Sequence, residues 1–83
     1  MKITIKYFAS IREATGLGQE VVETSATTLG ALRAELVARG GGYALSLAPG
    51  RAVRMALNQT MAEAEQALVD GAEVAFFPPV TGG

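Results

Sequence analysis

One segment of the sequence has the residue spacing of an amphipathic helix that could cover a sheet. Its apolar residues recur at helical intervals, at Leu29, Leu32, Leu36 and Val37. This spacing places them in one stripe on the helix surface. Thr27 or Thr28 is the expected N-cap, because its hydroxyl oxygen can accept a hydrogen bond from the first turn. We expect a helix from Leu29 to Arg39, with the Arg39 cation near the negative end of the helix dipole. Gly40, Gly41 and Gly42 are expected to end it.

Strand patterns flank this helix on both sides. Apolar and polar residues alternate with a period of two, as in half-buried strands. The expected strands are residues 2–9, 19–24, 52–58 and 72–77. The first two strands are joined by a short connection, so we expect them to pair antiparallel. If the first and last strands are parallel neighbours, the chain between them crosses one face of the sheet, and the helix provides that crossing.

The connections between these elements are expected to be irregular. Residues 10–18 form a polar connection with Gly16 and Gly18 in turns and Ile11 as its apolar anchor. Residues 43–51 form a connector that includes a short helical turn. Residues 60–69 have no regular pattern, and their expected anchors are Met61, Leu68 and Val69. Asp70-Gly71 is a turn signal before the last strand.

The order strand, strand, helix, strand, strand predicts an α+β fold of the β-grasp type. A mixed sheet of four to five strands would pack on one main helix. Residues 1–77 are expected to form this domain, and residues 78–83 an extended C-terminal tail with a flexible Gly-Gly end. The predicted core comprises Ile3, Ile5, Leu32, Leu36, Val53, Met55, Leu57, Val74 and Phe76.

Composition excludes several classes of function. The chain has neither Cys nor His, which removes disulfides, thiolate nucleophiles, imidazole bases and the commonest transition-metal ligands. A net charge of −1 gives no electrostatic reason to expect nucleic acid or an anionic membrane as a partner. No apolar stretch could span a bilayer, and no signal-peptide block precedes the first strand, so we expect a cytoplasmic protein.

The acidic residues near the end of the chain are interpreted as a solvated rim. These residues are Glu63, Glu65, Asp70 and Glu73. Paired carboxylates can form a catalytic dyad or a metal site, but here they lie in a polar segment and a turn. We expect no metal site, and a rim of this charge could face a basic partner surface.

The last eight residues, Phe76 to Gly83, form the segment with the strongest functional signal. Pro78 and Pro79 lack backbone donors and favour a stiff extended exit from the sheet. Gly82 and Gly83 have no side chains and could enter a channel as wide as a backbone. Phe77 points outward beside this exit, which makes it a candidate interface anchor. Arg54, outward on the third strand, is a second candidate.

The whole chain resembles the ubiquitin-like proteins, and most closely the sulfur-carrying small subunits of molybdopterin synthases. Three stretches carry the resemblance: Tyr7 to Glu13 followed by Gly16, Val53 to Gln59, and Asp70 to Gly83. The thiamine-pathway sulfur carriers are similar, but usually shorter and without the first block or the Pro-Pro approach. Ubiquitin-like modifiers share the fold and the Gly-Gly end.

This resemblance implies a function without catalytic side chains on the chain itself. The Gly83 carboxylate would be adenylated with ATP by a ubiquitin-activating-like enzyme and converted to a thiocarboxylate with sulfur from a donor protein. The tail, Pro78 to Gly83 including Val80, Thr81 and Gly82, would insert into the large synthase subunit and donate sulfur to a cyclic pyranopterin. The chain itself would bind no cofactor. The alternatives are a protein modifier attached through Gly83, a thiamine-pathway carrier, and an interaction module with an idle tail.

Overall fold

The protein is a single mixed sheet with helices on one face. The computed structural model describes residues 1–79, so the predictions for Val80, Thr81, Gly82 and Gly83 lie outside the described residues. The strands are β1 (Lys2–Tyr7), β2 (Gln19–Glu23), β3 (Arg54–Leu57), β4 (Thr60–Ala62) and β5 (Glu73–Phe77). Their order across the sheet is β2-β1-β5-β3-β4. The expected mixed sheet is confirmed, with five strands.

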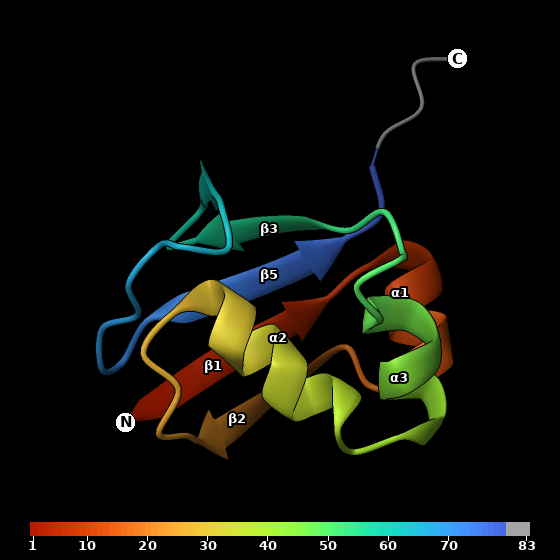
Figure 1. Cartoon of the computed structure of the whole chain (residues 1–83), viewed down its shortest axis with the longest axis horizontal. Helices are drawn as coiled ribbons and strands as arrows, with labels where there is room; N and C mark the ends of the chain where they lie inside the picture. The colour runs from red at the N-terminus through yellow and green to blue at the C-terminus, as the bar shows by residue number, and fades with distance from the viewer. Residues whose placement is uncertain (80–83) are drawn as a thin grey trace.

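The centre of the sheet joins the two ends of the described chain. β1 pairs antiparallel with β2, as predicted. It pairs parallel with β5, which meets the condition under which the helix was expected to provide the crossing. β5 pairs antiparallel with β3, which forms a hairpin with β4. Figure 1 shows β1 and β5 side by side with α2 crossing in front of them. Parallel neighbours need a crossover connection, and α2 lies within it.

Three helices are present among the described residues: α1 (Ala9–Thr15), α2 (Leu29–Val37) and α3 (Gly41–Leu47). Thr28 is the N-cap of α2, and its side chain accepts a hydrogen bond from the Ala31 amide at 3.1 Å. The predicted cap is therefore confirmed. No helix in the described part of the chain is long and apolar enough to cross a membrane.

The prediction of a polar connection over residues 10–18 is wrong for most of its length. Residues 9–15 form α1, which buries Ile11, and Gly16 ends the helix in a left-handed conformation. The helix was missed because it is short, has a single buried residue, and has Phe8 rather than a polar side chain at its N-cap. Ile11 is the apolar anchor, as predicted.

The glycine triplet starts a helix instead of ending one. α2 already ends at Val37, so Arg39 is not in its last turn, contrary to the prediction. Gly40 precedes α3 with φ of 78°, and Gly41 has φ of 54°. Such values favour glycine, so the triplet reverses the chain between α2 and α3. The short helical turn expected after Tyr43 is part of α3.

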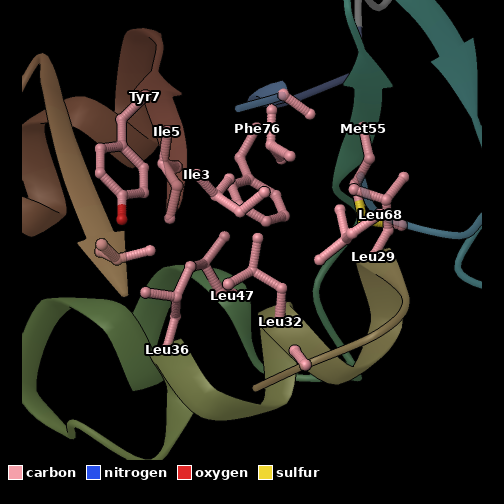
Figure 2. Close-up of a cluster of buried hydrophobic side chains, with 14 of the residues drawn as sticks. Ile3, Ile5, Tyr7, Leu29, Leu32, Leu36, Leu47, Met55, Leu68 and Phe76 are labelled. Carbon is pink, nitrogen blue, oxygen red and sulfur yellow. The ribbon is translucent and has the colours of Figure 1, made fainter. Parts of the chain in front are cut away.

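The core lies between the sheet and the helices (Figure 2). Seven of the nine predicted core residues are buried, and Val53 and Leu57 are half-buried against the same cluster. In Figure 2 the side chains of Ile3, Ile5 and Phe76 extend from the sheet toward Leu32 and Leu36 of α2. Leu29, Leu47 and Tyr7 complete the centre of the cluster.

The prediction of an irregular segment over residues 60–69 is wrong at its start, because residues 60–62 pair with β3 as the short strand β4. Two of its three expected anchors are also exposed. Leu68 is buried, but Met61 is 55% exposed and Val69 56% exposed. Met61 lies on β4, where it pairs with Ala56 in register and faces away from the core. Glu63, Glu65 and Asp70 are exposed. No group of three acidic side chains that could hold a metal ion occurs in residues 1–79.

Candidate functional site

An apolar hollow of about 560 Å³ lies where the chain leaves β5. It is on the outer face of the sheet, opposite α2, and the start of α1 borders it. We call it the apolar hollow. It is lined by Phe8, Ala9, Ala56, Gln59, Met61, Ala75, Phe77, Pro78 and Pro79. Phe8 is 47% exposed, so a large aromatic side chain faces solvent beside the exposed Met61. This cluster of exposed apolar side chains makes the hollow a candidate binding surface.

Strand alternation produces the apolar hollow. Along β5, Val74 and Phe76 are fully buried in the core, so Ala75 and Phe77 face outward, as predicted. Ala75 is opposite Ala56 of β3, which is opposite Met61 of β4. The two alanines form a shallow floor, and the longer side chains rise around it. Alternation on three neighbouring strands therefore places these residues in one row.

Phe8 and Phe77 form an aromatic pair at the edge of the hollow. Their ring centroids are 6.4 Å apart and the ring planes are nearly perpendicular, at 87°. This edge-to-face arrangement is a favourable geometry for two aromatic rings. Phe77 is thus half-buried by a contact that does not involve the core. Its role as an interface anchor remains a prediction, and its position is consistent with that role.

Arg54 lies beside Phe77 but faces a different hollow. The two residues are direct neighbours in the β3–β5 register, and Arg54 is exposed, as predicted. It lines a more polar hollow of about 740 Å³ together with Glu63 and Glu65. Met61 lines both hollows, so they border each other at this side chain. Arg54 makes no ion pair with the described residues, and its contact with a partner stays a prediction.

Pro78 and Pro79 line the hollow at the start of the tail. They place the exit of the chain directly beside the exposed aromatic pair. A partner that covers the hollow would therefore also meet the tail. Gly83, the predicted reactive residue, and Gly82, Thr81 and Val80 lie outside the described residues.

The most perturbed titratable groups belong to a second cluster, away from the outer face. The Glu20 cluster consists of Tyr7, Glu20, Arg39 and Tyr43. The Glu20 carboxylate accepts hydrogen bonds from the Tyr7 hydroxyl at 2.7 Å and the Tyr43 hydroxyl at 2.9 Å. Arg39 donates to both Glu20 oxygens at 3.0 Å and lies 4.9 Å from the centre of the Tyr43 ring.

The Glu20 cluster is electrostatically satisfied. Burial alone raises the pKa of Glu20, but the hydrogen bonds from Tyr7, Arg39 and Tyr43 outweigh burial and lower that pKa below its usual value. Burial, followed by the hydrogen bond to Glu20, raises the pKa of Tyr7 above its ordinary value. Because the carboxylate is already paired, these groups suit a structural link better than acid–base catalysis.

The arrangement favours binding over side-chain catalysis. The hollow presents aromatic rings, methyl groups and one amide, and the sequence contains no Cys or His to act as nucleophile or base. Phe8 and Met61 are the contact candidates that the sequence interpretation did not single out. The signal for Phe8 was available, because Ile3, Ile5 and Tyr7 alternate inward and the next residue must face outward. Met61 gave no such signal, because β4 is very short.

Known proteins resemble this chain in both sequence and structure. The molybdopterin synthase sulfur carrier subunit of Escherichia coli is 42% identical over 81 residues, which cover 98% of this chain and 99% of that protein. The corresponding structure from the complex of subunits 1 and 2 of molybdopterin-converting factor of Helicobacter pylori aligns over the full length of both chains, with a TM-score of 0.70 and 28% identity.

A similar structure also occurs in a protein of a different name. SAMP1, small archaeal modifier protein 1, from Haloferax volcanii has a TM-score of 0.78 and 26% identity over the full length of both chains. These neighbours share the ubiquitin-like β-grasp fold predicted here. Residues 5–83 match the ThiS family, which is nearly the whole chain. The chain therefore belongs to the ThiS family.

Proposed function

We propose that this chain is the sulfur carrier subunit of a molybdopterin synthase and that it carries sulfur as a thiocarboxylate on Gly83. The observation that carries the proposal is the near full-length similarity to the Escherichia coli subunit of that name. Two features support it: the sequence contains the Gly82-Gly83 pair, and Pro78 and Pro79, which precede that pair, line an exposed apolar hollow.

The chemistry requires activation by another protein. A terminal carboxyl group has a pKa of about 3.5, so at neutral pH it is ionised and unreactive toward a sulfur nucleophile. Adenylation with ATP by a ubiquitin-activating-like enzyme makes AMP the leaving group. Sulfur from a donor protein then displaces AMP and leaves the thiocarboxylate. In the large synthase subunit the thiocarboxylate sulfur forms a bond to cyclic pyranopterin. Water then cleaves the bond between that sulfur and the Gly83 carbonyl carbon, which returns Gly83 to a carboxylate.

The large subunit is the proposed partner for the apolar hollow. The Helicobacter pylori structure holds subunits 1 and 2 together, which supports a two-subunit assembly for this chain as well. The large subunits would form a central dimer, and the assembly would then contain two copies of each subunit. Binding across Phe8, Phe77 and Met61 would guide the tail into the large subunit, where the catalytic side chains lie.

The test changes the length of the tail without touching the sheet. Deletion of Gly83, or addition of one residue after it, is expected to abolish molybdopterin formation and to leave the melting temperature nearly unchanged. One residue moves the carboxyl group by about 3.5 Å, and misplacement of about 1 Å can slow a positioned reaction about 10²-fold.

The assay measures molybdopterin formation from the pyranopterin precursor with purified large subunit. Chemically thiocarboxylated wild-type chain is the positive control. The extended chain is assayed with the activating enzyme and a sulfur source, and its mass is checked after the reaction. Full activity from a chain that still carries its extension would refute the assignment of Gly83 as the sulfur-bearing residue.

A protein modifier is the second candidate, favoured by the structural similarity to small archaeal modifier protein 1. Both functions begin with adenylation of Gly83, and they differ in the acceptor of the activated carboxyl group. Mass spectrometry of the chain from its host distinguishes them. A shift from carboxylate to thiocarboxylate supports sulfur transfer, whereas isopeptide adducts on lysines of other proteins support the modifier. Sulfur transfer is the better supported function, because the relative with that name is more similar in sequence.

A further inference from the structure

Backbone strain is concentrated around the apolar hollow. Three residues other than glycine have positive φ among residues 1–79: Ala9 at 50°, Asn58 at 48° and Gln59 at 67°. Ala9 and Gln59 both line the hollow, and Asn58 precedes Gln59. Left-handed backbone is unfavourable for residues with a Cβ, and it tends to persist where a functional position requires it.

Gln59 occupies a turn position that glycine would fill without strain. Asn58 and Gln59 are the two residues between the paired Leu57 and Thr60 of the β3–β4 hairpin. Two-residue hairpin turns with positive φ at both positions favour Asn at the first and Gly at the second. Asn58 follows this preference, whereas Gln59 stands where glycine is preferred. Gln59 is exposed, and its side chain makes no hydrogen bond with the described residues, so the fold itself gives no reason for glutamine.

Asn58 fixes the turn that presents Gln59. Its backbone amide donates to the Glu73 carbonyl oxygen at 2.8 Å, and its Oδ1 accepts from the Glu73 amide at 2.9 Å. Glu73 in turn pairs with Lys6, with Nζ and Oε1 3.4 Å apart. The hairpin is thereby attached to the start of β5. Gln59 is held at the hollow by a turn whose first residue is bonded twice to Glu73 of β5.

Gln59 is also the polar member of an otherwise apolar surface. The other eight residues that line the hollow are Phe, Met, Ala or Pro. A primary amide offers two donors and one acceptor. A hydrogen bond at the edge of an apolar interface adds specificity, because a partner without the matching group leaves the amide unpaired.

We propose that Gln59 determines the specificity of docking, by hydrogen bonding through its side-chain amide to a polar group of the large synthase subunit. The inference rests on the proposed function, because it takes the large subunit as the partner at the apolar hollow. Gln59 is then a strained residue that is retained for binding. Its replacement by glycine should raise stability and lower affinity, which a purely structural residue would not do.

The test compares two substitutions at this position in the full-length chain. Gln59→Gly relieves the strain and removes the amide, so the urea midpoint should rise while affinity for the large subunit falls about 10-fold or more, the effect of leaving one buried polar group unpaired. Gln59→Met keeps the length and the strain but lacks the amide. It should lower the affinity similarly with an unchanged urea midpoint.

Gln19→Met is the matched control, because it removes the same side-chain amide from an exposed position on β2 that does not line the hollow. Its affinity should stay within about twofold of wild type, well below the loss expected for an unpaired polar group.

Binding of the wild-type chain to the large subunit is measured first, by calorimetry. If the wild-type chain does not bind the large subunit, the proposed function is refuted together with this inference. If the wild-type chain binds, two results for Gln59→Gly would refute only the role of Gln59: an affinity equal to that of wild type, or a urea midpoint below that of wild type.

Discussion

At the scale of single residues, Gly42 illustrates how one missing side chain shapes the molecule. A Cβ at Gly42 would overlap the backbone carbonyl group of Ala14, so α3 can approach α1 only because this atom is absent. We expect Gly42→Ala to lower the free energy of unfolding by about 1–3 kcal/mol, the usual effect of overpacking. Urea denaturation monitored by circular dichroism measures the change.

The control for this substitution is Gly50→Ala. A Cβ at Gly50 meets no atom within 4 Å, so its free energy of unfolding should stay within about 0.5 kcal/mol of wild type. If both substitutions lowered the free energy of unfolding equally, the loss would come from replacing a glycine and not from the contact of α3 with α1.

At the scale of elements, the Glu20 cluster joins β1 and β2 to the segment that carries α3. Glu20 lies on β2, Tyr7 on β1, Tyr43 on α3, and Arg39 between α2 and α3. Because folding lowers the pKa of Glu20, its contribution to stability is fully present above the ordinary pKa and is lost as the pH falls through the folded value.

This linkage predicts a pH-dependent effect of Glu20→Gln. The variant should unfold more readily than wild type at pH near 7, because it loses the charge that pairs with Arg39. The difference should narrow as the pH falls from about 4.3, the ordinary pKa of glutamate, through the lower pKa of the folded state, because the carboxylate of the unfolded wild type takes up a proton first and that of the folded protein follows. Urea midpoints across this range measure it. Glu13→Gln, at an exposed position without an ion pair among the described residues, is the control. A difference that is constant with pH would contradict the linkage.

At the scale of the whole molecule, the two faces of the sheet differ in role: one forms the core and the other carries the candidate binding surface. The inner face packs against the helices (Figure 1), and the outer face carries the apolar hollow. This separation predicts that Phe77→Ala weakens binding of the large subunit more than it weakens folding. Truncation of an aromatic anchor typically costs about 2 kcal/mol or more, about 30-fold in affinity.

Val21→Ala is the matched control for Phe77→Ala. Val21 is 58% exposed on β2, at the edge of the sheet opposite β4, and does not line the hollow. Calorimetry should show near wild-type affinity for this variant, and thermal unfolding should show little change for either. If Phe77→Ala lowers affinity only in proportion to stability, Phe77 serves the fold and the assignment of a docking face is wrong.

The sequence by itself determined four of the five strands, the crossing helix and the outward direction of Phe77. These features result from local periodicity: Ile3, Ile5, Val74 and Phe76 alternate along strands, and the leucines of α2 recur at helical spacing. Burial of one face is enough to produce such patterns. Segments without a strong local pattern were interpreted less well, as the short helices α1 and α3 show.

Only the tertiary structure decided which residues share the candidate site. Phe8 meets Phe77, and Met61 lies across the sheet from Ala75, because parallel pairing of β1 with β5 and the β3–β4 hairpin bring distant segments together. The Glu20 cluster likewise joins residues 13 to 23 positions apart. Contacts of this kind depend on strand order and register. Local periodicity contains no information on either, since it reports which face a side chain takes and not which neighbour it meets.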